Sequence, residues 1–166
     1  PDAALPVLVS IHGGSFTNGG ANEDRLNASY AVSLRKDLVV VVVQYRLGIF
    51  GFAGGDALGG GGNWGLLDQR LALRWVQRSI GSFGGDASRV LLAGQSAGGG
   101  SVASHLVAAG SRGLFASAAV LSGFGGWLTQ SPAEAQAVLG RLAARLGCTN
   151  GTAAARCLRA APARAV

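Results

Sequence analysis

Residues 90–98, with the sequence VLLAGQSAG, join a short apolar run to a G-x-S-x-G pentapeptide. The run 90–93 predicts a buried strand, and the small apolar residues of 97–109 predict a helix packed among neighbours. A serine between such a strand and such a helix has strained backbone dihedrals, and the flanking glycines remove the Cβ atoms that would clash. The turn exposes the Ser96 hydroxyl at the carboxyl end of the strand, so the pattern predicts a nucleophile.

Further strands and helices are predicted on both sides of this turn. The runs 7–11 and 38–43 are rich in β-branched residues, which predicts parallel strands buried on both faces, and 116–121 is a weaker strand. Strands that alternate with helices predict an α/β fold, with a mostly parallel sheet and helices on both faces. The helices are expected within 23–36 and over 66–80, 97–109 and 132–146, where Pro132 suits a first turn.

The segment 66–80 carries two stripes of side chains at helical spacing. One stripe is apolar and the other is basic, which predicts an amphipathic helix with its arginines in solvent. We assign no function to these arginines. The apolar stripe comprises Leu67, Leu71 and Trp75, and the basic stripe comprises Arg70, Arg74 and Arg78.

Composition excludes several classes of protein. Of the 166 residues, 49% are hydrophobic and only 13% are charged, which excludes a disordered chain. The longest apolar run, 38–43, is far shorter than the roughly 20 residues that span a bilayer. The arginines behind the net charge of +6 are scattered, whereas nucleic-acid binding needs a clustered basic face. The glycine-rich loop 53–62 is no phosphate site, because no Lys-Ser/Thr pair follows it.

A second glycine-rich segment, His12-Gly13-Gly14-Ser15, directly follows the first strand. A nucleophile that accepts an acyl group needs backbone N–H donors for the tetrahedral oxyanion, each worth about 3–4 kcal/mol. One donor comes from the residue after the nucleophile, here Ala97, and the others come from a loop after an earlier strand. Both parts therefore occur here in the order that acyl transfer requires.

The stretch 83–98 resembles the nucleophile signature of type-B carboxylesterases, the carboxylesterase–cholinesterase family. The resemblance continues over most of the chain, in the family's order. Its further segments are 5–14, 45–52, 62–70, 73–76, 101–106 and 147–159.

This resemblance implies an α/β-hydrolase fold. Residues 1–166 would form the central part of one domain, with N-terminal strands, a signal peptide and the C-terminal half outside the chain. The absence of methionine and the start at Pro1 agree with an internal piece of a longer protein. The family's catalytic acid and histidine lie further downstream than residue 166, so this chain alone is expected to be inactive.

The implied reaction is hydrolysis of a small-molecule carboxylic ester through an acyl-enzyme, with no metal and no organic cofactor. Ser96 matches the nucleophile, and Gly14, Ser15 and Ala97 match the oxyanion-hole donors. Two positions depart from the family's pattern. Ser15 stands where a third glycine is usual, which keeps the N–H but adds a side chain, and Gln95 stands where glutamate is usual, which removes a charge. No residue predicts an oligomeric state.

The two histidines are expected to be structural. In the family's order the catalytic histidine comes last, after the serine and the acid, so His12 is not predicted to be a base. His105 lies nine residues after Ser96 on the same helix, about 13 Å along its axis. It cannot accept the Ser96 proton and is interpreted as a hydrogen-bonded core histidine.

Asp68 and Asp86 belong to structural motifs of the resembling sequences. Neither is predicted to be the catalytic acid. A buried ion pair between Asp68 and Arg46 is expected instead.

Cys148 and Cys157 close a short loop. In a reducing compartment they would be free thiols, and no nearby histidine supports a metal site. The resemblance implies a local disulfide, which contributes about 2–3 kcal/mol in the loop-entropy model. The sequons at Asn27 and Asn150 agree with glycosylation and with a secreted or secretory-pathway protein.

Two other functions stay open at this point. One is a non-catalytic cell-surface recognition protein like the neuroligins, which share the fold but typically lack the serine nucleophile. The other is the inactive product of a disrupted gene. Ser96 argues against the recognition protein.

Overall fold

The computed structural model describes residues 4–123, 129–149 and 153–166. Contacts divide the chain into two compact units. The first unit comprises Pro1–Tyr45 and Leu66–Trp127, and the second comprises Arg46–Gly65 and Leu128–Val166.

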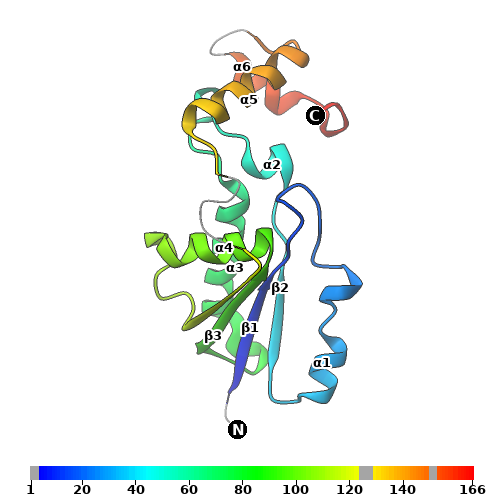
Figure 1. The fold of residues 1–166 in the computed structure, drawn as a ribbon, viewed down its shortest axis with the longest axis vertical. Coiled ribbons are helices and arrows are strands. Elements are labelled where there is room, and N and C mark those ends of the chain that lie inside the picture. Colours follow the sequence, from blue (N-terminus) through cyan, green and yellow to red (C-terminus); the bar gives the residue numbers. More distant parts are fainter. Residues whose placement is uncertain (1–3, 124–128, 150–152) are drawn as a thin grey trace. The chain divides into compact units, whose positions relative to one another are not determined.

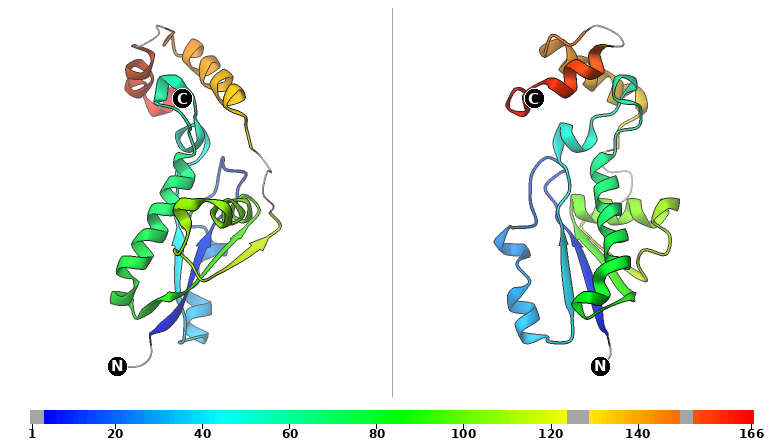
Figure 2. Two further views of the ribbon diagram at one scale, coloured as in Figure 1. Left: turned by 90° about the vertical axis from the view of Figure 1, so that its left-hand side faces the viewer. Right: turned by 180° about the vertical axis from the view of Figure 1, so that it is seen from behind.

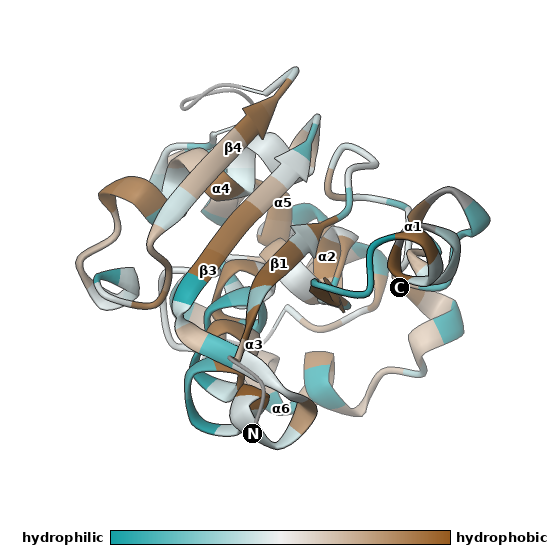
Figure 3. Ribbon diagram, turned by 90° about the horizontal axis from the view of Figure 1, so that it is seen from below, coloured by the Kyte–Doolittle hydropathy of each residue, from teal (hydrophilic) through white to brown (hydrophobic). Residues whose placement is uncertain are grey.

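A four-stranded parallel sheet lies at the centre of the first unit (Figure 1). Its strands are β1 (Leu5–Ile11), β2 (Val39–Val43), β3 (Gly85–Gln95) and β4 (Ser117–Leu121). They lie in the order β2-β1-β3-β4, and each neighbouring pair is parallel. The parallel α/β sheet expected from the apolar runs is therefore confirmed. Figure 3 shows the apolar stretches of β1 and β3 side by side.

The connections between these strands carry helices, as parallel pairing requires. They are η1 (Asp24–Leu26), α1 (Ser29–Leu34), α3 (Trp64–Ser79), η3 (Ile80–Phe83), α4 (Ala97–Val107) and η4 (Ala109–Ser111). The segment 23–36 thus contains two short helices, and α4 ends two residues earlier than expected.

On one face of the sheet the central side chains of β1 and β3 are buried, and the opposite face is only partly covered. Side chains alternate along a strand, and Val7, Val9 and Val90 share the buried face. On the opposite face Leu91 is 36% exposed. The prediction of strands buried on both faces is right for one face of β1 and wrong for β2, in which only Val43 is buried. The apolar runs do not show how much of each face the helices reach.

Helices nevertheless lie on both sides of the sheet (Figure 2). On the buried side Gly85 lies against the side chains of Ile80 and Val7, so the start of η3 lies beside β1. On the other side Val32 of α1 lines one hollow together with Val40 and Val42 of β2.

The buried face of α3 differs from the one predicted. The fully buried residues are Gln69, Leu73 and Val76, followed by Ile80 in η3. The predicted apolar stripe of Leu67, Leu71 and Trp75 is 38%, 60% and 39% exposed. Both stripes fit the helical period. The buried stripe was not recognised in the sequence because it contains the polar Gln69. Arg74 and Arg78 are exposed, as predicted, whereas Arg70 is half-buried.

The second unit contains short helices. They are α2 (Gly48–Phe52), η2 (Asp56–Leu58), α5 (Pro132–Arg145), α6 (Ala154–Ala160) and η6 (Ala163–Ala165). Helix α5 begins with a reciprocal capping box, in which Ser131 Oγ accepts from Glu134 N and the Glu134 carboxylate accepts from Ser131 N. Pro132 lies in the first turn of α5, as expected.

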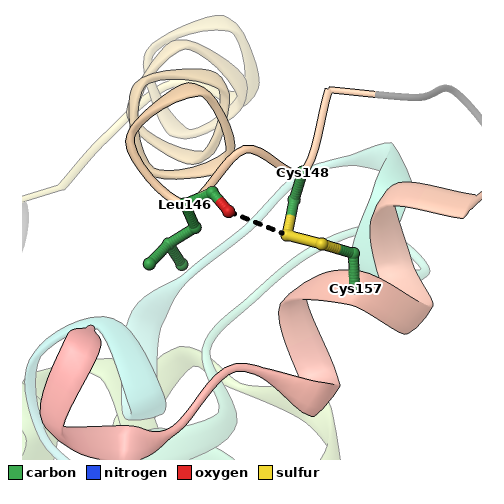
Figure 4. The surroundings of a disulfide bond; sticks show 3 residues. All are labelled: Leu146, Cys148 and Cys157. Atoms are coloured by element: carbon green, nitrogen blue, oxygen red, sulfur yellow. Dashed lines mark hydrogen bonds between the residues drawn. A yellow bond between two sulfur atoms is a disulfide. The ribbon is translucent and has the colours of Figure 1, made fainter.

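The disulfide expected from the resemblance is present. Cys148, just after α5, is bonded to Cys157 in α6 (Figure 4). The two cysteines are nine positions apart in the sequence, and Cys148 is buried. It therefore ties α6 to the end of α5. The sequon residue Asn150 lies outside the described residues.

Candidate active site

Ser96 lies in a sharp turn between the last residue of β3 and the first residue of α4. Its φ of 55° and ψ of −120° are unusual for a residue with a side chain, a conformation that costs about 1–3 kcal/mol. Two backbone hydrogen bonds hold the turn: Ser96 N donates to Leu121 O at 2.9 Å, and Gly100 N donates to Ser96 O at 2.9 Å. The strained serine predicted from the pentapeptide is therefore present.

The glycines of the pentapeptide let β3, α4 and β1 approach one another. A Cβ on Gly94 would collide with the carbonyl of Gly98, four residues later. A Cβ on Gly98 would collide with Ile11 O at the end of β1 and would lie 2.9 Å from His12 O. Each neighbour is a backbone atom and cannot turn aside. The predicted reason for glycine on each side of Ser96 is therefore confirmed.

The loop after β1 lies directly against this turn. A Cβ on Gly13 would lie 2.7 Å from Gln95 O and 3.2 Å from Ser96 Cβ. Gly14 has a φ of 114° and Ser15 a φ of 53°, so their successive amides turn away from the extended path of the strand. The segment 12–15 therefore lies against the turn that contains Ser96.

Three backbone amides of this site have no backbone acceptor among the residues that the structure describes. In the parts of the chain that the structure describes, no carbonyl accepts a hydrogen bond from the N–H of Gly14, Ser15 or Ala97. The Ala97 amide belongs to the first turn of α4, where intrahelical partners are missing. The Gly14 carbonyl accepts from Thr17 N at 2.9 Å and Asn18 N at 3.0 Å, which holds the loop in its turn.

His12 has the surroundings of a structural residue. Its side chain is 1% exposed, and its ring stacks on Tyr45 with centroids 4.4 Å apart. Nδ1 lies 2.8 Å from Gly13 O, and Tyr45 Oη donates to His12 O at 2.8 Å. Burial raises the pKa of Tyr45 to about 12, so this phenol stays protonated and keeps its hydrogen bond. The ring thus braces the start of the glycine-rich loop.

His105 is a hydrogen-bonded core histidine, as predicted. It is 4% exposed, with Nδ1 2.9 Å from Ser111 Oγ and Nε2 3.1 Å from Gln69 Oε1. Gln69 also donates from Nε2 to Ser101 Oγ at 3.1 Å. Sequence reasoning missed Gln69 and Ser101, because a single polar residue on a helix gives no sign of its partner.

The buried His105 makes stability depend on pH. Burial, and secondarily the charge of Arg70, lowers the pKa of His105 to about 4 from its usual 6.5. Between these values the unfolded chain binds the proton and the folded chain does not, so stability falls as the pH drops from about 6.5 to about 4. We expect this residue to account for a loss of about 3 kcal/mol.

Unfolding by urea at pH 7 and at pH 4 measures this loss. The His105→Gln variant is expected to lose about 3 kcal/mol less than the wild type over this interval, because glutamine does not titrate. Equal losses in both proteins would contradict the assignment.

The acidic residues considered at the sequence level have structural surroundings where the structure describes them. Asp86 Oδ1 accepts from Ser88 Oγ at 2.6 Å and from Ser88 N at 2.8 Å, and these bonds lower the pKa of Asp86. It therefore stabilises the turn at the start of β3. The ion pair between Asp68 and Arg46 stays a prediction, but the expected burial is wrong, because Arg46 is exposed.

The described residues contain no group of three His, Cys, Asp or Glu side chains arranged to hold a metal ion. No helix among them combines the length and the apolar character needed to cross a membrane.

Comparison with known proteins places this geometry in a family. The model of the Carboxylesterase family matches residues 1–166. Similar proteins include an acylcarnitine hydrolase of Mus musculus, 44% identical over 158 residues, and a cocaine esterase of Oryctolagus cuniculus, 42% identical over 159 residues. An acetylcholinesterase of Bungarus fasciatus is 41% identical over 162 residues.

These alignments cover nearly all of this chain but only part of each relative. They include 93%, 94% and 93% of the chain, and 28%, 29% and 26% of the respective relatives. The chain thus spans a little over a quarter of the length of the proteins it matches.

Proposed function

Because the chain belongs to the carboxylesterase family, we propose that it supplies the nucleophile and the oxyanion hole of a serine hydrolase that cleaves small-molecule carboxylic esters. The observation that carries this proposal is the strained turn at Ser96, with the 12–15 loop against it. We propose further that residues 1–166 form the central part of one α/β-hydrolase domain.

In the proposed reaction Ser96 Oγ attacks the ester carbonyl carbon. The carbonyl oxygen gains negative charge and accepts hydrogen bonds from the amides of Gly14, Ser15 and Ala97. The Ser96 proton passes to a histidine outside residues 1–166, which returns it to the departing alcohol. Water then attacks the acyl-enzyme and releases the carboxylic acid.

The backbone strain at Ser96 serves the proposed reaction. The positive φ of Ser96 belongs to the turn between the end of β3 and the start of α4, the type of turn that exposes the nucleophile of a serine hydrolase. The first turn of α4 begins at the next residue, and its positive dipole end favours an oxyanion there. The strain is thus part of the arrangement that makes acyl transfer possible.

We also propose that the protein is made in the secretory pathway and that Asn27 is glycosylated. Support comes from the Cys148–Cys157 disulfide, a bond typical of oxidising compartments, and from the exposure of Asn27. The Asn27 side chain accepts from Ser29 N at 3.0 Å, so the sequon forms a surface turn. The same modification is proposed at Asn150.

Labelling of the full-length protein with a fluorophosphonate tests the proposed hydrolase. An activated serine bonds to the phosphorus and releases fluoride, so one adduct is expected per chain. Peptide mapping by mass spectrometry should place the adduct on Ser96. An adduct on another serine would contradict the assignment, and the absence of any adduct would favour the non-catalytic recognition protein.

A further inference from the structure

We propose that Gln69, Ser101 and His105 position the oxyanion-hole end of α4, through a buried chain of hydrogen bonds that ends on Ala97. This inference rests on the proposed hydrolase function, because Ala97 matters here as an oxyanion donor. The three residues touch no substrate and act through the helix.

The hydrogen bonds allow only one arrangement of protons. Ser101 Oγ donates to Ala97 O at 3.0 Å, so it accepts from Gln69 Nε2 at 3.1 Å. Gln69 Oε1 is then an acceptor, and His105 Nε2, 3.1 Å away, must carry the proton. His105 Nδ1 therefore accepts from Ser111 Oγ at 2.9 Å. The chain runs in one direction from Ser111 to Ala97.

Every member of the chain is buried. Gln69 and Ser101 are 0% exposed, Ser111 is 1% exposed and His105 is 4% exposed. Water therefore cannot replace a missing partner, and the loss of one bond leaves the next group unsatisfied. The lowered pKa of His105 keeps its ring neutral near pH 7, as this arrangement requires.

The first turn of α4 has no long side chain that could fix its rotation against α3. It begins Ala97-Gly98-Gly99-Gly100, four residues with no side chain beyond a methyl group. Glycine is a poor helix former, and these residues have no side chains to interlock with α3. Ser101 is the first residue of α4 with a longer side chain, and it joins the helix to Gln69 of α3. Directional bonds specify one rotation of α4, which apolar contacts alone would not.

The rotation of α4 bears on the proposed reaction through the amide of Ala97. A small misplacement of an oxyanion donor weakens its bond to the transition state more than it weakens substrate binding. Loss of the chain should therefore lower kcat while KM stays nearly constant. A residue that only stabilises the fold would lower the melting temperature without this change.

The test compares Gln69→Leu with Gln77→Leu in the full-length protein. Gln77 is a matched control, because it lies on the same helix and its Nε2 donates two partly buried hydrogen bonds, to Ala87 O at 2.8 Å and to Leu114 O at 3.1 Å. Both variants are expected to melt at a lower temperature than the wild type. The measurements are kcat and KM for p-nitrophenyl acetate, and the affinity for a trifluoromethyl ketone that forms an oxyanion on the serine.

We expect Gln69→Leu to lower kcat by about 10-fold or more and to weaken ketone binding by a similar factor, with KM within about twofold. Gln77→Leu should keep all three quantities within about twofold. An unchanged kcat in Gln69→Leu, or equal losses of kcat in both variants, would overturn the proposal.

If Gln69→Leu does not fold, a milder variant tests the same proposal. Ser101→Ala removes one hydroxyl and breaks the chain next to Ala97, so kcat should again fall several-fold with little change in KM. An unchanged kcat in folded Ser101→Ala would overturn the proposal in the same way. A wild-type protein that neither hydrolyses the ester nor reacts with fluorophosphonate contradicts the proposed function itself, and this inference with it.

Discussion

Replacement of Ser96 with alanine in the full-length protein is expected to lower kcat for ester hydrolysis by about 10⁵- to 10⁶-fold, the size of loss seen when a serine hydrolase loses its nucleophile. The oxyanion donors remain, so a small residual acceleration over water should persist. Alanine keeps the Cβ that Ser96 already accommodates at its φ of 55°, so the fold should be unchanged. Steady-state kinetics with p-nitrophenyl acetate measure kcat, and circular dichroism shows whether the fold is unchanged.

Ser104→Ala is the matched control for this experiment. Ser104 is a half-buried serine on α4, the helix that begins directly after Ser96, and its hydroxyl donates to Gly100 O at 2.9 Å. Its loss should leave kcat within about twofold. Hydrolysis that survives in Ser96→Ala would show that another residue is the nucleophile and would contradict the proposed reaction.

Gly98→Ala is expected to damage both the fold and the proposed activity. The added methyl group would collide with Ile11 O and crowd His12 O, so β1 and α4 would have to move apart. We expect a loss of about 3 kcal/mol in the free energy of unfolding. Because the same movement separates the Ser96 turn from the 12–15 loop, kcat should fall by about 100-fold or more in whatever protein still folds.

Gly140→Ala provides the control. Gly140 lies within α5, and a Cβ there meets nothing within 4 Å. Alanine is a better helix former, so this variant should be more stable by up to about 1 kcal/mol. Urea unfolding of both variants makes the comparison. Equal stability of Gly98→Ala and the wild type would show that β1 and α4 can move apart at little cost, which would contradict the close contact at Gly98.

The nucleophilic turn could be predicted because its requirements are local. A strand must end, a helix must begin, and glycines must flank the serine, and each condition is visible within 90–98. The disulfide between Cys148 and Cys157 was implied by the resemblance, and the structure contains it. These features depend on residues close together in the chain.

The buried face of α3 shows where local pattern reasoning fails. The stripe of Leu67, Leu71 and Trp75 has the right spacing and the right polarity, yet it is exposed. Periodicity reports that a helix has an apolar stripe, but when two stripes qualify it does not report which one meets the sheet. The position of Gln69 opposite Ser101 settles the question, and that pairing joins residues 32 positions apart.

By itself, the sequence determined the parallel α/β plan, the serine between its glycines and the order of the two site segments, because turn geometry and strand periodicity are set by neighbouring residues. Only the tertiary structure decided that the 12–15 loop touches the Ser96 turn, which face of α3 is buried, and that a chain of polar groups runs from Ser111 to Ala97. Contacts of this kind depend on how separate elements pack in three dimensions. The spacing of residues along the chain does not determine the distance between elements that are far apart in sequence.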